Sequence, residues 1–170
     1  MIVCMIILVV SFLLDGILTN FLPFSVGDLS LFTPLTTIVA IVVLYPLFYK
    51  QEKKYYILSF VTGIIYDLFY TNLWFFDGFM FLFIAFIVCY LSRVMGDNYL
   101  KILLQILVII IIYEISFALL IALFNLVPMT IERLLYKISH SLILNLIYGE
   151  VLYVIIKALP KKAKKIRISG

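Results

Sequence analysis

The sequence predicts an all-α integral membrane protein with six transmembrane helices and both termini in the cytoplasm. Three observations lead to this fold class. Hydrophobic residues make up 66% of the 170 residues and charged residues only 13%, whereas soluble domains average about 45–50% and about 25%. The apolar residues form six separate runs, and most basic residues gather between alternate runs. This composition leaves no room for a sizeable soluble domain.

Each run is taken as one membrane-spanning helix, because about 20 apolar residues cross a hydrocarbon core of about 30 Å. The expected spans are residues 1–22, 31–49, 55–70, 73–92, 99–124 and 131–159. Together they form one membrane domain, 1–159, followed by a basic cytoplasmic tail, 160–170.

The first two spans are joined by a turn at 24–30 that contains glycine and aspartate. The first run lacks a basic start and a small-residue cleavage site, so we expect a retained span rather than a signal peptide. Pro34 is expected in the first turn of the second span, where proline is tolerated. A charged loop, 50–54, then leads to the third span.

The third and fourth spans are expected to form a hairpin whose tip lies below the outer membrane surface. The third span has 16 residues and would be about 24 Å long, which is short for a bilayer. Ser59, Gly63 and Asp67 are spaced by four and share one helical face, where small residues let another backbone approach. Asp77 and Gly78 open the fourth span. We therefore expect Asp67 and Asp77 to anchor the hairpin.

The fifth and sixth spans carry polar residues at similar depth. Glu114 lies about 20 Å from the inner end of the fifth span, and His140 lies about 13 Å from the outer end of the sixth. Glu114 is therefore expected to pair with either His140 or Lys137. These two bases belong to a polar edge of the sixth span formed by Arg133, Lys137, His140, Ser141, Asn145 and Tyr148.

The basic residues set the expected orientation. Eleven of the thirteen fall on one side if the N-terminus is cytoplasmic, and only Arg133 and Lys137 lie toward the other side. Cytoplasmic loops carry the excess of Lys and Arg in membrane proteins. The basic excess therefore indicates topology rather than nucleic-acid binding. The tail can also contact anionic lipid headgroups, although a simple topological signal explains it equally well.

Ionisable residues at membrane depth need a partner or a purpose. Asp15, Asp67 and Asp77 are expected in the outer half, within reach of Arg133 and Lys137. Three interpretations remain open: ion pairs that fix helix packing, a surface that receives a partner's transmembrane helix, or a transport or ligand cavity. The residues expected in this partner-binding site or polar network are Asp15, Gly63, Asp67, Asp77, Gly78, Glu114, Arg133, Lys137 and His140.

The sequence offers no catalytic set. It has no Gly-rich phosphate loop and no Cys–His dyad, and Cys4 and Cys89 are isolated in apolar runs. A single histidine without a cysteine pair cannot assemble a zinc site. Asp15-Gly16 is expected to be a helix-end turn, and we find no convincing internal repeat. We therefore expect no catalytic residue, no metal, no cofactor and no enzymatic activity.

Two segments carry a resemblance to a known family. The first span contains Leu14-Asp15-Gly16, and the third contains Gly63-Ile64-Ile65-Tyr66-Asp67-Leu68, followed by a short turn and Gly78. With its length, layout and basic tail, the chain resembles the MreD family of bacterial rod shape-determining proteins. It departs from that family at residues 70–74, which read Tyr-Thr-Asn-Leu-Trp where a turn richer in Gly and Pro is usual.

The resemblance implies a non-enzymatic scaffold of the cell-elongation complex in the bacterial plasma membrane. Such a scaffold would support lateral peptidoglycan synthesis and cell shape. Its expected partners would be MreC, RodA and a class B penicillin-binding protein. The resemblance also implies a fold similar to the S-component of energy-coupling-factor transporters. The alternative function is therefore that of a substrate-binding membrane subunit of such a vitamin transporter.

Overall fold

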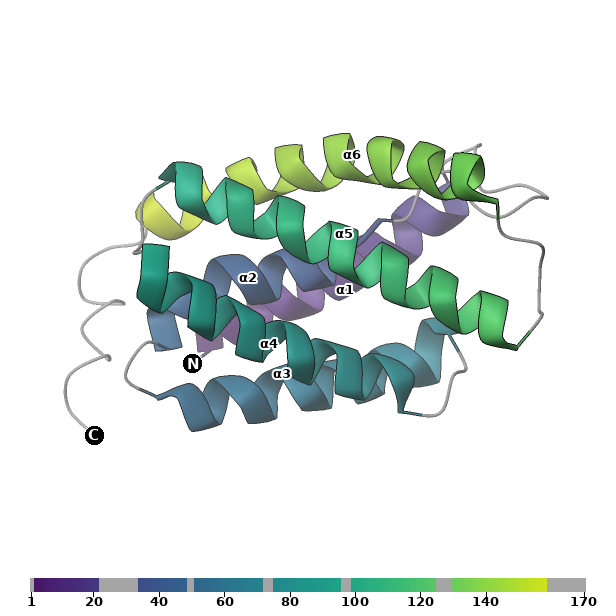
Figure 1. The fold of residues 1–170 in the computed structure, drawn as a ribbon. Coiled ribbons are helices and arrows are strands. Elements are labelled where there is room, and N and C mark those ends of the chain that lie inside the picture. The colour runs from purple at the N-terminus through teal and green to yellow at the C-terminus, as the bar shows by residue number, and fades with distance from the viewer. Residues whose placement is uncertain are drawn as a thin grey trace.

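A computed structural model describes residues 2–21, 34–48, 51–71, 75–95, 99–124 and 130–158. The regular structure in these ranges is helical throughout, which confirms the all-α prediction. The helices are α1 (Ile2–Phe21), α2 (Thr36–Phe48), α3 (Glu52–Tyr66), the π-helical turn η2 (Asp67–Thr71), α4 (Phe76–Met95), α5 (Tyr99–Leu123) and α6 (Ile131–Ala158). They run roughly along one direction, and α1 begins at the same end of the bundle at which α6 ends (Figure 1).

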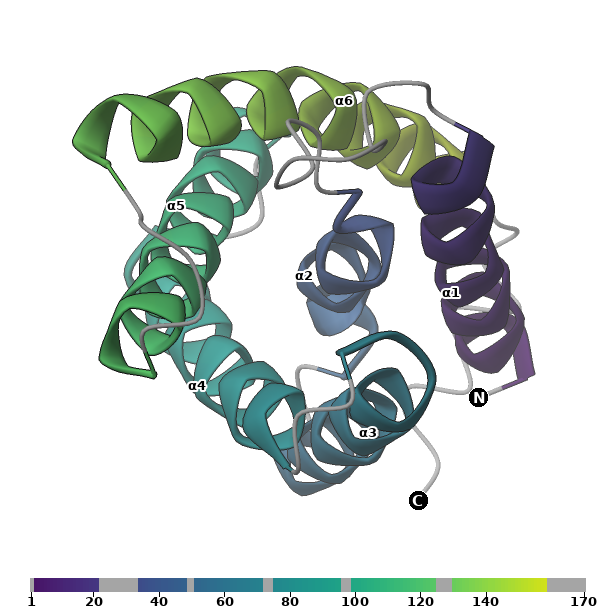
Figure 2. The same ribbon diagram turned by 90° about the vertical axis from the view of Figure 1, so that its right-hand side faces the viewer.

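The helix α2 occupies the centre of the molecule. Figure 2 shows it inside a ring formed by α1, α3, α4, α5 and α6. Every side chain from 34 to 45 is buried, and Val39 and Ala40 have no exposed surface. A helix that is hydrophobic on all sides is one that other elements surround. The ring therefore packs on α2 as its core.

The central helix is shorter than the span expected at 31–49. It has 13 residues, or about 20 Å at 1.5 Å per residue, so it does not match a hydrocarbon core of about 30 Å. Pro34 precedes the helix instead of lying in its first turn, and Pro46 lies inside its last turn. The helix begins only at Thr36 because side chains from two other helices bind the backbone there, as described below.

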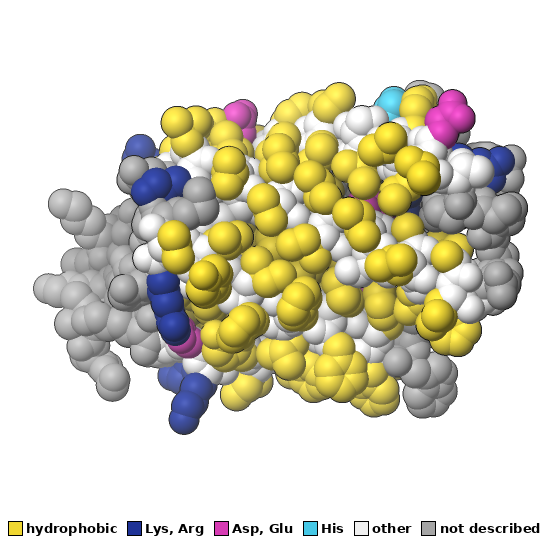
Figure 3. Space-filling model, in the orientation of Figure 1, with side chains coloured by type: hydrophobic (Ala, Val, Ile, Leu, Met, Phe, Trp, Pro, Cys, Tyr) yellow, Lys and Arg dark blue, Asp and Glu magenta, His cyan; other side chains and the backbone are white. Residues whose placement is uncertain are grey.

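Four of the described helices, α1, α4, α5 and α6, are long and apolar enough to cross a membrane. Hydrophobic side chains cover the middle of the surface, most of the visible Lys and Arg side chains gather at one end, and a smaller basic group lies at the other end (Figure 3). Large apolar side chains such as Ile6 and Val9 are more than half exposed. A continuous apolar belt of this size is rare on soluble monomeric proteins. In a protein with several helices long enough to cross a membrane, we interpret it as the surface that faces lipid. The chain is a membrane protein.

Two stretches that lie outside the expected spans are helical, residues 52–54 and 93–95. Lys53 and Lys54 belong to the first turn of α3, and Arg93 belongs to α4, where its Nη2 lies 2.6 Å from Glu52 Oε2. With 15 residues in α3 and 5 in η2, this limb of the hairpin spans 20 residues. It is therefore longer than the 16-residue span expected at 55–70. The expected turn at 24–30, residues 125–129 of the turn expected at 125–130, and the tail from 160 lie outside the described residues.

The α3–α4 hairpin closes through a direct backbone contact at Gly63. A Cβ atom placed on Gly63 would overlap the carbonyl oxygen of Asp77 and lie 2.8 Å from Gly78 Cα. Only glycine allows this approach, as the small-residue spacing predicted. The hairpin also packs against α1, because the Tyr70 hydroxyl donates a hydrogen bond to the Phe12 carbonyl at 2.6 Å.

We expect Gly63→Ala to lower the free energy of unfolding by about 3 kcal/mol, because neither Asp77 nor Gly78 can move its backbone away without separating the helices. The measurement is SDS-induced unfolding in mixed micelles. Gly149→Ala is the matched control, since the atom that a Cβ there would meet first is the flexible end of Ile106. Equal losses in the two variants would show that Gly63 has no special role.

Candidate functional site

The buried start of α2 is bound by the carboxylate of Asp15 from α1. Asp15 Oδ1 accepts hydrogen bonds from Thr36 N at 2.7 Å and Thr36 Oγ1 at 2.8 Å. Its Oδ2 accepts from Thr37 N at 3.0 Å and Thr37 Oγ1 at 2.5 Å. Helix N-termini expose unpaired N–H groups and carry partial positive charge. One carboxylate thus satisfies two of these N–H groups and lies within hydrogen-bond distance of two hydroxyls, of which Thr36 Oγ1 shares its one proton with the Ser11 carbonyl oxygen at 2.7 Å.

Helix α6 also contacts the start of α2. Leu35 N donates to Asn145 Oδ1 at 2.9 Å, so the residue before α2 is bound from α6. The α1 and α6 helices are also linked directly, because Ser11 Oγ lies 2.8 Å from the Tyr148 hydroxyl. The start of the central helix therefore joins three helices at one buried point.

Asp67 binds the start of α4 in the same way. Asp67 Oδ1 accepts from Asp77 N at 3.1 Å, and Oδ2 accepts from Gly78 N at 3.0 Å. Asp67 itself is only 4% exposed. The expectation that Asp67 and Asp77 anchor the hairpin is consistent with this contact, although the anchoring groups are one carboxylate and two backbone N–H groups.

The two capping aspartates share a short sequence pattern that our search for repeats missed. Asp15 is followed by Thr19 and Asn20, and Asp67 by Thr71 and Asn72, at identical spacing. In each case the acid lies near the end of one helix and binds the first N–H groups of the next α-helix. Asp15-Gly16 was expected to be a helix-end turn, but it lies inside α1. Three matching positions are too few to stand out in so apolar a sequence.

Hydrogen counting around Thr71 assigns a protonation state. The Thr71 hydroxyl lies 3.0 Å from Asp67 Oδ1 and 2.9 Å from Asp77 Oδ2, yet it has one proton to donate. Both oxygens of Asp67 accept backbone N–H groups, an arrangement that suits an acceptor-only group. Asp77 Oδ1 accepts from the Tyr113 hydroxyl at 2.8 Å. The consistent arrangement has a neutral Asp77 that donates from Oδ2 to Thr71, and Thr71 donates to Asp67.

Glu114 of α5 forms an ion pair with Lys137 of α6. Lys137 Nζ lies 3.0 Å from Glu114 Oε2, and Ser141 Oγ donates to Glu114 Oε1 at 3.2 Å. The Lys137 ammonium also lies 5.0 Å from the centre of the Phe117 ring, within the range of a cation–π contact. Of the two bases expected for Glu114, the structure therefore shows Lys137. His140 Nδ1 lies 2.8 Å from the Tyr136 carbonyl oxygen of its own helix.

The expected network divides into three separate centres. The donors to the aspartates are hydroxyl and backbone N–H groups, whereas Lys137 reaches Glu114. Arg133 is exposed in the first turn of α6, where its backbone N–H donates to Thr130 Oγ1 at 3.3 Å. Asp15, Asp67 and Asp77 were expected within reach of Arg133 and Lys137. In the described part of the structure Lys137 pairs with Glu114, and the three aspartates bind hydroxyl and backbone N–H groups, mostly of neighbouring helices.

Several residues of these centres were not expected from the sequence. They are Thr36, Thr37, Thr71 and Tyr113. Thr36 and Thr37 lie at the start of α2, and Thr is among the residues preferred at helix starts, so this signal was available. Tyr113 had none, because an aromatic residue in an apolar span looks like any core side chain.

In chemical terms the site holds helices in place. Among the described residues, no group of three or more His, Cys, Asp and Glu side chains could hold a metal ion. Asp15, Asp67, Asp77 and Glu114 are each less than 5% exposed. These carboxyls therefore act on packing inside the bundle.

We expect Asp77→Asn to change the free energy of unfolding by less than about 1 kcal/mol, because an amide reproduces the donor and the acceptor of the neutral acid. Asp67→Asn should lower the free energy of unfolding by about 1.5–3 kcal/mol, since the NH₂ group of the new amide would face a backbone N–H instead of accepting from it. SDS titration of the two purified variants measures both. A larger loss for Asp77→Asn than for Asp67→Asn would refute the assigned proton.

Lys137→Met should destabilise the protein by about 3–5 kcal/mol, because it leaves the Glu114 charge buried without its partner. Adding Glu114→Gln to Lys137→Met should restore most of the loss, since a neutral pair needs no counter-charge. The same unfolding measurement tests this double-mutant cycle. Additive losses would show that the two side chains do not interact.

Comparison with known protein families gives one match. The profile described as rod shape-determining protein MreD matches residues 1–163. No curated protein and no solved structure matches the chain. The match covers nearly the whole sequence, including the two segments on which the resemblance was based. The chain therefore belongs to the MreD family of rod shape-determining proteins.

Proposed function

We propose that this protein is a membrane scaffold of the cell-elongation complex in the bacterial plasma membrane, where it supports lateral peptidoglycan synthesis. The proposed partners are MreC, RodA and a class B penicillin-binding protein. The observation that carries the proposal is the family match over residues 1–163, since the family determines rod shape. The proposal includes no catalytic step and no cofactor.

The proposed topology has six spans with both termini in the cytoplasm, as in the S-component fold. Four described helices have the length and composition of a span. The α3–η2 limb adds 20 residues. The sixth span is the shorter helix α2, which lies inside the ring formed by the other five helices. The basic residues at one end of the surface (Figure 3) support the placement of that end in the cytoplasm.

A scaffold needs one defined shape, and the buried centres are suited to provide it. Asp15, Asp67 and Glu114 each join the first helix of a hairpin to the second or to its start. Because these acids are buried, their proposed role in partner recognition is indirect: they position the helices whose outer faces meet MreC. Arg133 is exposed on α6 and is the residue of the set proposed to touch a partner directly.

Depletion of the protein from a rod-shaped host should give round or swollen cells, because lateral wall synthesis would lose its scaffold. Microscopy of cell length and width measures this, and an Asp77→Asn copy, matched in expression level, should restore rods. Normal shape together with a requirement for a vitamin would contradict the proposal and support the transporter alternative. A small molecule retained by the purified protein would point the same way.

A further inference from the structure

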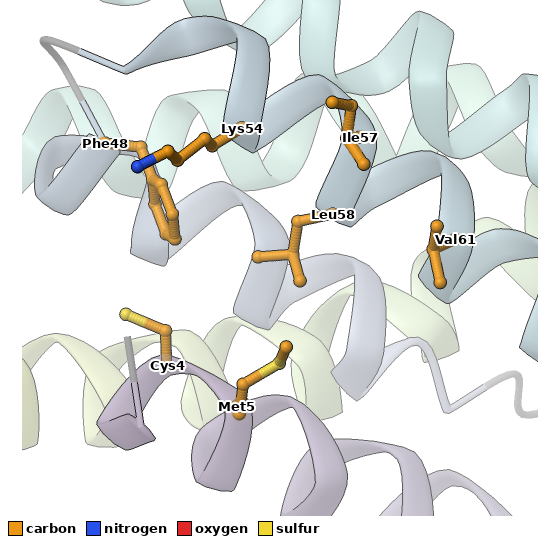
Figure 4. A pocket seen from close by; sticks show the side chains of 7 residues that line it. All are labelled: Cys4, Met5, Phe48, Lys54, Ile57, Leu58 and Val61. Atoms are coloured by element: carbon orange, nitrogen blue, oxygen red, sulfur yellow. The ribbon is translucent and has the colours of Figure 1, made fainter.

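A crevice opens between α1 and α3 on the lipid-facing side of the molecule. It has a volume of about 250 Å³ and reaches Phe48 at the end of the central helix. Cys4 and Met5 line it from α1, and Lys54, Ile57 and Val61 line it from α3 (Figure 4). The wall of the crevice is apolar, and Lys54 contributes its aliphatic stem to it.

The crevice lies at one level of the bundle. Its residues come from the start of α1, the end of α2 and the start of α3, which meet at the end that the basic residues assign to the cytoplasm. From Lys54 to Val61 it extends about 10 Å along the helix axis. Lys54 therefore lies at headgroup level, and the apolar part lies at the depth of the inner leaflet.

The crevice changes from charged to apolar along its length, as a phospholipid does from its headgroup to its acyl chains. A cation lies at the outer rim, where a phosphate would be, and an apolar channel runs inward, where an acyl chain would be. The volume accommodates about eight groups of about 30 Å³, the size of a water molecule or a methylene. This is sufficient for the upper part of one acyl chain.

We propose that this crevice is a binding site for one anionic phospholipid of the inner leaflet, with its phosphate on Lys54 and an acyl chain between α1 and α3. The charge decides the occupant. A partner's transmembrane helix could fill the apolar part, but only a helix with an acidic side chain at the height of Lys54 would also match the charge. Every anionic lipid carries a negative charge at that height. The inference rests on the proposed topology and is independent of the proposed role in cell shape.

Native mass spectrometry of the purified full chain with equal amounts of phosphatidylglycerol and phosphatidylcholine tests the site. The wild type should retain phosphatidylglycerol preferentially. Lys54→Gln should weaken its binding about fivefold, the effect of one basic residue near an anionic headgroup. Lys53→Gln is the matched control: it removes the same charge one residue away, from a side chain that does not line the crevice, and should leave binding unchanged.

Filling the apolar part gives an independent readout. Met5→Trp should lower retention of both lipids, because the larger side chain occupies the apolar part of the crevice. Met5 is exposed, so the variant should still fold. Unfolding in SDS checks that its stability is unchanged. Equal losses of phosphatidylglycerol binding in Lys53→Gln and Lys54→Gln would contradict a defined site and indicate a diffuse attraction of the lipid to the basic end. Equal retention of the two lipids by the wild type, or no effect of Met5→Trp, would overturn it as well. So would cross-linking of a partner's single span through Met5→Cys in cell membranes.

Discussion

The structure depends on the contact between Asp15 and the first residues of α2. A helix that begins inside a membrane protein presents unpaired N–H groups where no water can reach them. The Asp15 carboxylate accepts from Thr36 and Thr37 through backbone and hydroxyl groups, and the helix start supplies the positive potential that a buried anion requires. This contact allows a 13-residue helix to stand in the centre, with five longer helices packed around it.

The α3–α4 hairpin solves the same problem a second time. Asp67 binds the N–H groups of Asp77 and Gly78, and Gly63 allows the backbone approach that brings them within reach. A second charged carboxylate beside Asp67 would be costly in this surrounding, which agrees with the neutral state that hydrogen counting assigns to Asp77. The third hairpin uses an ion pair, Glu114 with Lys137, in place of a helix start.

These buried centres lie inside a member of a shape-determining family. Their carboxyls are each less than 5% exposed, so they can influence recognition only through the positions of the helices. The surfaces exposed to other molecules are the apolar outer faces and the basic end. The crevice at Lys54 lies where these two kinds of surface meet, which is why a single amphiphilic lipid suits it.

The sequence by itself determined the helical membrane class, the family, and the limits of α5 and α6 to within one residue. Uninterrupted apolar runs between charged or proline-containing turns carry that information locally. The spacing of Ser59, Gly63 and Asp67 likewise predicted a close backbone contact.

Only the tertiary structure decided that α2 is central, because an apolar run looks the same in the sequence whether lipid or protein surrounds it. The structure also decided the partners of the acids. Lys137 and His140 lie on one edge of α6 at similar depth, and the packing of α5 against α6 brings Lys137 to Glu114. Asp15 and Asp67 bind backbone groups whose positions depend on where a neighbouring helix begins, and no residue pattern within their own helices encodes that position.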